Sequence, residues 1–213
     1  YARYKLGWVL YNQKNYEQSI DTFHKVVDKT DAAVGFQKQA LSDMVMGYAE
    51  VKNGWQRARK YYTKVRDKQF AYGKLNDLAG VYESQGKNRK AIAVYNYFID
   101  KRPNHPDIPV WMKNITMVRK GMGNLPALEK SMNRFIAYLN PNGAWAAQNS
   151  GNDKALKKAN QLVKSSLAYL SNKYHRMAQD SGKNKQYSKA VKYYSKYIDR
   201  FPNDPASFDM NFF

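Results

Sequence analysis

The sequence predicts an all-α fold in which helical hairpins stack on one another, an α-solenoid. The first observation is a repeated segment, because residues 190–205 (AVKYYSKYIDRFPNDP) restate residues 91–106 (AIAVYNYFIDKRPNHP). The second is that the small, aromatic and aliphatic residues of each copy recur at helical spacing until a proline ends the helix. The third is a preceding helical segment that ends at Gly86, so the first copy is the second helix of a helix-turn-helix unit.

Residues 78–103 resemble a tetratricopeptide repeat. That family places a large residue, Leu, a small residue and Tyr on helix A, then Ala and an aromatic residue on helix B, and a proline after it. The residues that match this pattern are Leu78, Ala79, Tyr82, Gly86, Ala91, Tyr95, Phe98 and Pro103. The resemblance implies a right-handed solenoid in which helices A and B alternate and neighbouring hairpins stabilise one another.

Weaker copies of this pattern predict four repeats, at about 1–30, 38–68, 73–103 and 109–139. The small residue of helix B recurs at Ser19, Ala58, Ala91, Ala127 and Ala190. The first three steps between these positions are close to the ~34 residues of the family, and the last step is nearly twice as long. The fourth unit is irregular, because Ser131 stands where helix B should have an aromatic residue.

The C-terminal part of the chain departs further from a regular array. Residues 140–153 are rich in Pro, Gly, Asn and Ser, which predicts a loop. Residues 154–205 predict one extended helix, with an apolar stripe from about 155 to 180, followed by the helix B of a last repeat. The extended helix would serve as helix A of that repeat. Residues 206–213 resemble the opening of another helix A, which predicts a further repeat that is truncated.

Basic residues dominate the charge of the chain. It has 36 Lys and Arg against 17 Asp and Glu, a formal net charge of +19. Between residues 154 and 200 the only acids are Asp180 and Asp199. Such a surface attracts polyanions, so nucleic acid, an anionic membrane surface and an acidic protein are all candidate partners.

The basic residues fall mainly on the expected helices B and on the extended helix, as in residues 57–68 and 183–196. These are outer faces of the array. Tyrosines alternate with lysines there, as they do in proteins that stack nucleic-acid bases. We expect Tyr62, Tyr187 and Tyr194 to occupy core positions of the repeats instead. For the outer faces we therefore expect a solvated basic surface first, contact with an acidic partner or an anionic membrane next, and nucleic acid last.

The family resemblance implies that helices A line a concave groove that holds partner peptides. The residues expected to face it are Asp43, Met44, Gly47, Glu50, Asn76, Asp77, Gly80, Glu83, Lys113, Thr116 and Lys120. Family members that clamp a C-terminal carboxylate use Lys, Asn and Arg on these faces, whereas this chain has acids in its second and third repeats. Because Gly47 and Gly80 leave space beside these acids, we expect a basic or neutral extended segment as the ligand. The alternative is that these positions form a solvated face only.

The sequence offers little for catalysis or cofactor binding. It has no cysteine, and His24, His105 and His175 stand far apart without a second ligand at metal spacing. Residues 121–126 (GMGNLP) lack the last glycine of a dinucleotide-binding loop and follow an expected helix rather than a strand. We therefore expect a non-enzymatic protein with no cofactor and no metal. The alternatives are a basic solenoid that binds a polyanion, and the helical arm of a larger cell-wall enzyme.

The exits of the two duplicated helices bear on location. Residues 95–106 and 194–205 share the form Tyr, two residues, Phe or Tyr, Ile, three residues, Pro-Asn, one residue, Pro. This form resembles bacterial envelope tetratricopeptide proteins, among them outer-membrane assembly lipoproteins and the periplasmic Tol-Pal-associated family. The resemblance implies an interaction scaffold in the bacterial periplasm or cell envelope, with the cytoplasm as the alternative. Because the chain begins at Tyr1 without an initiator methionine, we expect it to be part of a longer protein.

Overall fold

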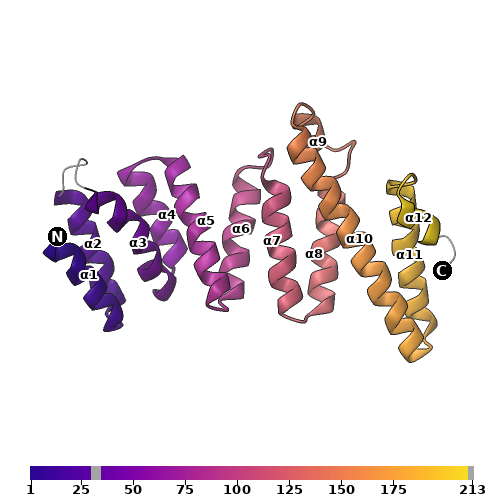
Figure 1. Ribbon diagram of the computed structural model, residues 1–213, viewed down its shortest axis with the longest axis horizontal. Coiled ribbons are helices and arrows are strands. Elements are labelled where there is room, and N and C mark those ends of the chain that lie inside the picture. Colours follow the sequence, from indigo (N-terminus) through magenta and orange to yellow (C-terminus); the bar gives the residue numbers. More distant parts are fainter. Residues whose placement is uncertain (30–34, 211–213) are drawn as a thin grey trace. The chain divides into compact units, whose positions relative to one another are not determined.

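The computed structural model describes residues 1–29 and 35–210, and these residues fold into helices without any strand (Figure 1). The predicted all-α fold class is confirmed. The chain divides into two compact units, Tyr1–Asp100 and Lys101–Phe213. Thr30, at the end of the first expected repeat, and residues 211–213, at the end of the expected truncated repeat, lie outside the described residues.

The first unit is a series of helical hairpins in chain order. Its helices are α1 (Ala2–Asn12), α2 (Tyr16–Lys29), α3 (Phe36–Glu50), α4 (Gly54–Val65), α5 (Lys68–Ser84) and α6 (Asn88–Lys101). Each hairpin packs on the next, because α3 contacts α1 and α2 before it and α5 after it. The repeats expected at about 1–30, 38–68 and 73–103 overlap these three hairpins, with α5 beginning earlier, at Lys68, and the division into repeats stays a prediction.

Small residues let neighbouring helices of the first unit approach one another closely. A Cβ atom added to Gly7 would lie 2.7 Å from the ring of Phe23, and one added to Gly47 would lie 2.8 Å from the side chain of Ile20. Ser19, at the small position of the first helix B, is fully buried and donates a hydrogen bond of 2.7 Å to the carbonyl oxygen of Gly7. A larger side chain at any of these positions would push two helices apart.

Tyrosines fill much of the interior of the first unit. Tyr48, Tyr62 and Tyr82 are almost fully buried. The hydroxyl of Tyr62 donates a hydrogen bond of 2.9 Å to the carbonyl oxygen of Leu41. Burial raises the pKa of Tyr82 to about 12, so its phenol stays neutral in the core. The large rings supply apolar contact area between successive hairpins, which a repeat on its own could not bury.

The second unit combines one hairpin with a long helix. Its helices are α7 (Ile108–Gly121), α8 (Leu125–Tyr138), α9 (Ala144–Gln148), α10 (Asp153–Ser181), α11 (Asn184–Arg200) and α12 (Pro205–Met210). Helix α7 packs on α8, and α10 contacts α7, α8 and α11. Among the described helices of the chain, none is both long enough and apolar enough to span a membrane.

Helix α10 begins and ends at recognisable signals. The side chain of Asn152 accepts a hydrogen bond from the backbone N–H of Ala155, which caps the first turn. Gly182 follows the last turn in the left-handed conformation, with φ of 66°, which glycine adopts without steric cost. Its 29 residues extend over about 44 Å at 1.5 Å per residue. Helix α10 is therefore the extended helix that the sequence predicts near residues 155–180.

The segment at 140–153 is not the continuous loop that its composition predicts, because it contains α9. The indole N–H of Trp145 donates a hydrogen bond of 3.0 Å to the carbonyl oxygen of His105. The side-chain amide of Asn149 donates one of 3.1 Å to the carbonyl oxygen of Asn104. These contacts hold one short turn of helix against the segment before α7, and local composition does not encode them.

Candidate partner-binding site

Helix α5 presents an open face in the first unit. Asn76, Asp77 and Gly80 are exposed, and Gly73 lies one turn before them on the same side. A Cβ atom added to Gly73 or Gly80 would meet no other atom within 4 Å. The space expected beside Gly80 is therefore present, and a partner backbone can approach this part of α5 closely.

Three of the expected groove residues are instead part of the packed interior, and the prediction for them is wrong. Met44 is fully buried and Thr116 is nearly so, with its hydroxyl donating a hydrogen bond of 2.9 Å to the carbonyl oxygen of Met112. Gly47 packs against Ile20 and leaves no free space. The cause is the helical register, since a neighbouring position on a helix points about 100° away and can fall on the buried side.

The acids of α3 bind groups from the adjacent hairpins. The carboxylate of Asp43 accepts hydrogen bonds from the hydroxyl of Tyr4 at 2.5 Å and from the indole N–H of Trp8 at 3.0 Å. The carboxylate of Glu50 accepts from the ammonium of Lys87 at 2.6 Å and from the amide of Gln85 at 2.7 Å. These two expected groove residues therefore connect α3 to the hairpin before it and to the hairpin after it.

The two acids of α5 differ in how open they are. Glu83 is partly buried and accepts a hydrogen bond of 2.7 Å from the hydroxyl of Tyr95. Asp77 forms an ion pair of 2.9 Å with Lys74 along the same helix, and 52 % of its side chain is exposed. The side chain of Lys74 is largely buried and also donates to Ser42 at 3.2 Å, so the half-exposed carboxylate of Asp77 is the open side of this pair. Asp77 is therefore the predicted groove acid best placed to meet a basic ligand.

The expected groove residues of the second unit lie on α7. Lys113 and Lys120 are both exposed, and the ammonium of Lys120 lies 4.8 Å from the ring centroid of Tyr169 on α10. With Thr116 buried between them, this face of α7 is basic. It contrasts with the acidic face of α5, and a basic ligand segment would gain nothing from it.

Each histidine packs against an aromatic side chain. The contacts are His24 stacked on Tyr61 at 3.8 Å, His105 stacked on Trp111 at 4.9 Å, and His175 hydrogen-bonded to the hydroxyl of Tyr194 at 3.0 Å. Burial lowers the pKa of His24 and of His105. Within residues 1–29 and 35–210, no group of three His, Asp or Glu side chains is arranged to hold a metal ion. The histidines act as packing residues.

Three tyrosines of the basic segments were expected at core positions of the repeats, and two of them are buried. Tyr62 and Tyr194 lie in the interior, whereas 42 % of Tyr187 is exposed, so the prediction for Tyr187 is wrong. Tyr187 lies in the first turn of α11, and its ring meets His175 edge-on at 6.4 Å.

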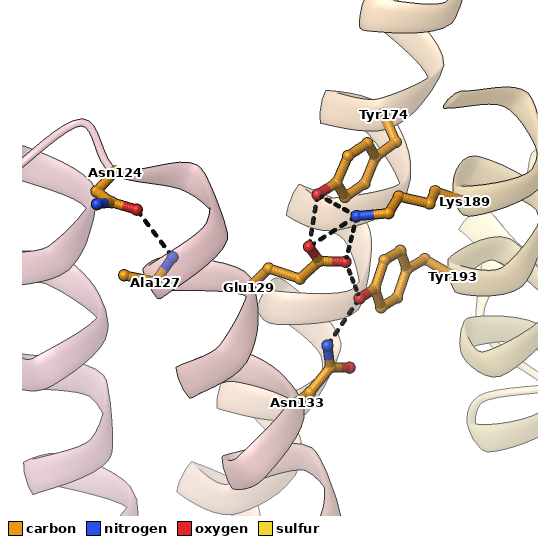
Figure 2. A network of polar contacts seen from close by, with 7 residues as sticks. All are labelled: Asn124, Ala127, Glu129, Asn133, Tyr174, Lys189 and Tyr193. Atoms are coloured by element: carbon orange, nitrogen blue, oxygen red, sulfur yellow. Dashed lines mark hydrogen bonds and ion pairs between the residues drawn. The ribbon is translucent and has the colours of Figure 1, made fainter. Parts of the chain in front are cut away.

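A polar cluster that sequence reasoning missed joins three helices of the second unit (Figure 2). Asn124 caps the start of α8, and Glu129 projects from the next turn toward α10 and α11. The carboxylate of Glu129 accepts hydrogen bonds from Tyr174 at 2.6 Å, from Tyr193 at 2.7 Å and from the ammonium of Lys189 at 2.9 Å. One carboxylate therefore connects α8, α10 and α11.

The electrostatics of this cluster favour the charged carboxylate. Burial opposes ionisation of Glu129, but the hydrogen bonds from Tyr174, Tyr193 and Lys189 outweigh burial and hold its pKa below the ordinary value. Burial and the hydrogen bond to Glu129 raise the pKa of Tyr193 to about 12, although the hydrogen bond that Asn133 donates to its hydroxyl lowers this pKa. The available sequence signal was that Glu129 is the only acid between residues 108 and 152.

Comparison with known families supports part of the reading of the sequence. A family model described as tetratricopeptide repeat matches residues 1–29 and 167–204. The first match covers α1 and α2, and the second covers the latter part of α10 with α11 and its exit. Together they make up about a third of the chain. Each unit therefore contains one segment that is similar to the tetratricopeptide repeat. No significant match to a curated protein was found.

Proteins built from tetratricopeptide repeats generally mediate protein–protein interaction and act as non-catalytic scaffolds. This gives the chain a general function class. The kind of partner and the surface that binds it do not follow from the match.

Proposed function

We propose that the chain is a non-enzymatic scaffold that binds an extended, basic or neutral segment of a partner protein on the open face of α5. The observation on which the proposal rests is the stripe of Gly73, Asn76, Asp77 and Gly80, which is exposed and free of covering atoms at both glycines. A peptide backbone can lie against glycine more closely than against any other residue. Asn76 and Asp77 then supply polar groups for a peptide that runs along the helix.

The charge of this face selects the ligand. Asp77 is half exposed and pairs with Lys74, so a Lys or Arg side chain of a partner can reach its carboxylate from the solvent side. The acids Asp43, Glu50 and Glu83 already bind groups of the unit itself. They shape the face and lower its affinity for acidic segments, because a like-charged ligand would be repelled.

We also propose that the complex belongs to the bacterial periplasm or cell envelope. The support is the shared exit form at residues 95–106 and 194–205, which resembles envelope tetratricopeptide proteins. The cytoplasm is the competing location. Because of the resemblance to envelope proteins, an envelope extract is the source of partners in the experiment below.

The test uses Gly80→Trp, which adds a large side chain on the open face of α5 at a position where the new Cβ atom meets no other atom within 4 Å. Replacing a helical glycine does not weaken the helix, so loss of binding would report the blocked face and not unfolding. The matched control is Gln56→Trp, which places the same side chain at an exposed position of α4. Asp77→Lys tests the charge of the face, and Glu83 is left intact because it binds Tyr95.

The measurement is capture of partners from a bacterial envelope extract at low and at high salt. We expect a partner that the wild type and Gln56→Trp retain at high salt and that Gly80→Trp and Asp77→Lys lose. Capture that disappears with salt and ignores both α5 variants would contradict the proposal. It would favour binding of polyanions by the basic faces instead.

A further inference from the structure

Two pockets lie between α8 and α11 in the second unit, one on each side of the Glu129 cluster. One, of about 550 Å³, lies beside Glu129 and Lys189, and the other, of about 510 Å³, lies beside Asn133 and Lys192. The contacts of Glu129 and Asn133 with α11 form a polar bridge between them (Figure 2). We refer to the two pockets and the bridge together as the α8–α11 trough.

The floor of the trough is apolar on both sides of the bridge. The apolar lining residues include Leu125, Pro126 and Met177 in the first pocket, and Ile136, Val163 and Leu167 in the second. Val163 and Leu167 belong to α10, which lies beneath the second pocket, and both are buried. An apolar side chain of a ligand that enters either pocket is therefore removed from water, which is favourable at about 25 cal/mol per Å².

One wall of the trough is a stripe of cations on α11. It consists of Lys185, Lys189, Lys192, Lys196 and Arg200, spaced three or four residues apart so that they lie on one side of the helix. From the first to the last, the stripe extends about 22 Å at 1.5 Å per residue. Lys189 is paired with Glu129, and Arg200 donates to Asn160 at 3.0 Å, whereas Lys192 and Lys196 are exposed.

We propose that the α8–α11 trough binds an acidic peptide segment of a partner protein that also carries apolar side chains. The argument is charge complementarity, because the only acids that line the two pockets are Glu129 and Asp199, against six Lys and Arg. Carboxylates of the ligand pair with Lys192 and Lys196 along the wall, and its apolar side chains enter the pockets on either side of the bridge. An extended segment of about seven residues is long enough to follow the stripe.

The trough does not suit nucleic acid. The rings of Tyr174 and Tyr193 stack on each other at 6.0 Å, and both hydroxyls donate to Glu129, so neither ring is free to receive a base. The apolar floor would also gain nothing from phosphates or sugars. This site differs from the face of α5 in unit, in charge and in ligand, so it is a second binding site and does not depend on the first.

The test measures binding of labelled synthetic peptides of about 12 residues to the chain by fluorescence anisotropy at neutral pH and near-physiological salt. The main probe alternates Glu and Leu. The comparison probes alternate Glu and Ser, or Lys and Leu, and a single-stranded oligonucleotide of similar charge tests nucleic acid. We expect the Glu and Leu peptide to bind at least about tenfold more tightly than each comparison probe, because charge and apolar side chains are both required.

Variants locate the site. The double variant Lys192→Glu, Lys196→Glu should weaken binding of the Glu and Leu peptide about tenfold or more. The control is the double variant Lys157→Glu, Lys173→Glu, which makes the same change in net charge at exposed positions of α10 that line neither pocket. This control should weaken binding about twofold or less. Ala137→Trp fills the second pocket from an exposed position without a change in charge, and should also weaken binding about tenfold. Gly80→Trp should leave it unchanged.

Several results would overturn the proposal. Equal weakening by both pairs of charge reversals would mean that net charge alone attracts the peptide. Equal binding of the Glu and Ser peptide, or no effect of Ala137→Trp, would remove the role of the pockets. Tighter binding of the oligonucleotide would replace the acidic peptide by nucleic acid as the ligand.

Discussion

The two units hold their helices together by different means. In the first unit several carboxylates each connect one pair of elements, as Asp43 does for α1 and α3 and Glu50 does for α3 and the turn before α6. In the second unit the single carboxylate of Glu129 connects α8, α10 and α11. The hairpin pattern is common to both units, and the polar contacts between hairpins are particular to each.

The two units also differ in how closely their glycines approach other helices and turns. Gly7, Gly47 and Gly54 each lie so close to another helix or turn that a Cβ atom would clash. In the described part of the second unit, glycines such as Gly121 and Gly151 face open space. The described glycines with the closest contacts therefore lie in the first unit, where Gly73 and Gly80 nevertheless face open space as Gly121 does.

The largest expected effect tests the close packing of the first unit. In Gly54→Ala the new Cβ atom would lie 1.8 Å from the carbonyl oxygen of Tyr48, at the turn between α3 and α4. Because backbone must move to relieve the clash, we expect a loss of about 3 kcal/mol or more in the free energy of unfolding. Urea unfolding combined with hydrogen exchange of peptides from each unit would measure it, with the loss appearing in the first unit.

The matched control is Gly121→Ala, because a Cβ atom there meets nothing within 4 Å. We expect this change to be neutral or to stabilise α7 by up to about 0.5–1 kcal/mol. Similar losses in the two variants would contradict the contrast between the units.

The second prediction removes the shared carboxylate of the other unit. Glu129→Ala leaves Tyr174, Tyr193 and Lys189 without their common acceptor, and hydrogen bonds to a charged group contribute about 1.5–3 kcal/mol. We expect a loss of that size, with faster hydrogen exchange in α8, α10 and α11 together. Faster exchange in α8 alone would show that Glu129 does not join the three helices.

The third prediction concerns acid, and its sign follows from the lowered pKa of Glu129. The ordinary value is 4.5, so the stabilisation by this group is complete above about pH 4.5 and is lost as the pH falls through the lower value of the folded chain. We expect the stability of the second unit to fall over this range in the wild type, and to fall less steeply in Glu129→Gln. Parallel pH profiles of the two proteins would contradict the assignment.

The smallest effect tests a contact between helices of the first unit. Arg57 on α4 donates two hydrogen bonds of 2.7 Å to Glu17 on α2, but 40 % and 59 % of the two side chains are exposed. A double-mutant cycle with Arg57→Ala and Glu17→Ala should give a coupling of about 0.2–1 kcal/mol that decreases with salt. A coupling above about 2 kcal/mol would mean that exposed pairs, and not close packing, dominate this unit.

Much of the fold could be predicted because it is recorded in short-range patterns. The small residues at Ala58 and Ala91 and the aromatic residues at Tyr82 and Phe98 recur at helical spacing, and all four are buried. These positions depend on contacts within a hairpin or with the next one, so their sequence signal is local.

The rest could not be predicted, for two physical reasons. Met44 and Gly47 were assigned to the wrong side of a helix, because the sequence marks the period of the helix more clearly than the direction of each side chain. The contacts of Glu129 and of Trp145 join residues about 40 or more positions apart, and no local pattern specifies them. Open faces and pockets depend on such contacts, so the candidate sites needed the structure.

The continuity of α10 has a consequence for how this chain can change in evolution. Asn160 and Lys164 contact Arg200 and Asp204, and Tyr174, further along the same helix, contacts Glu129. Deleting or inserting a single residue between Lys164 and Tyr174 would rotate one set of contacts by about 100° relative to the other. Homologous sequences should therefore vary between Lys164 and Tyr174 by substitution alone, and gaps in their alignment should fall outside this stretch of α10.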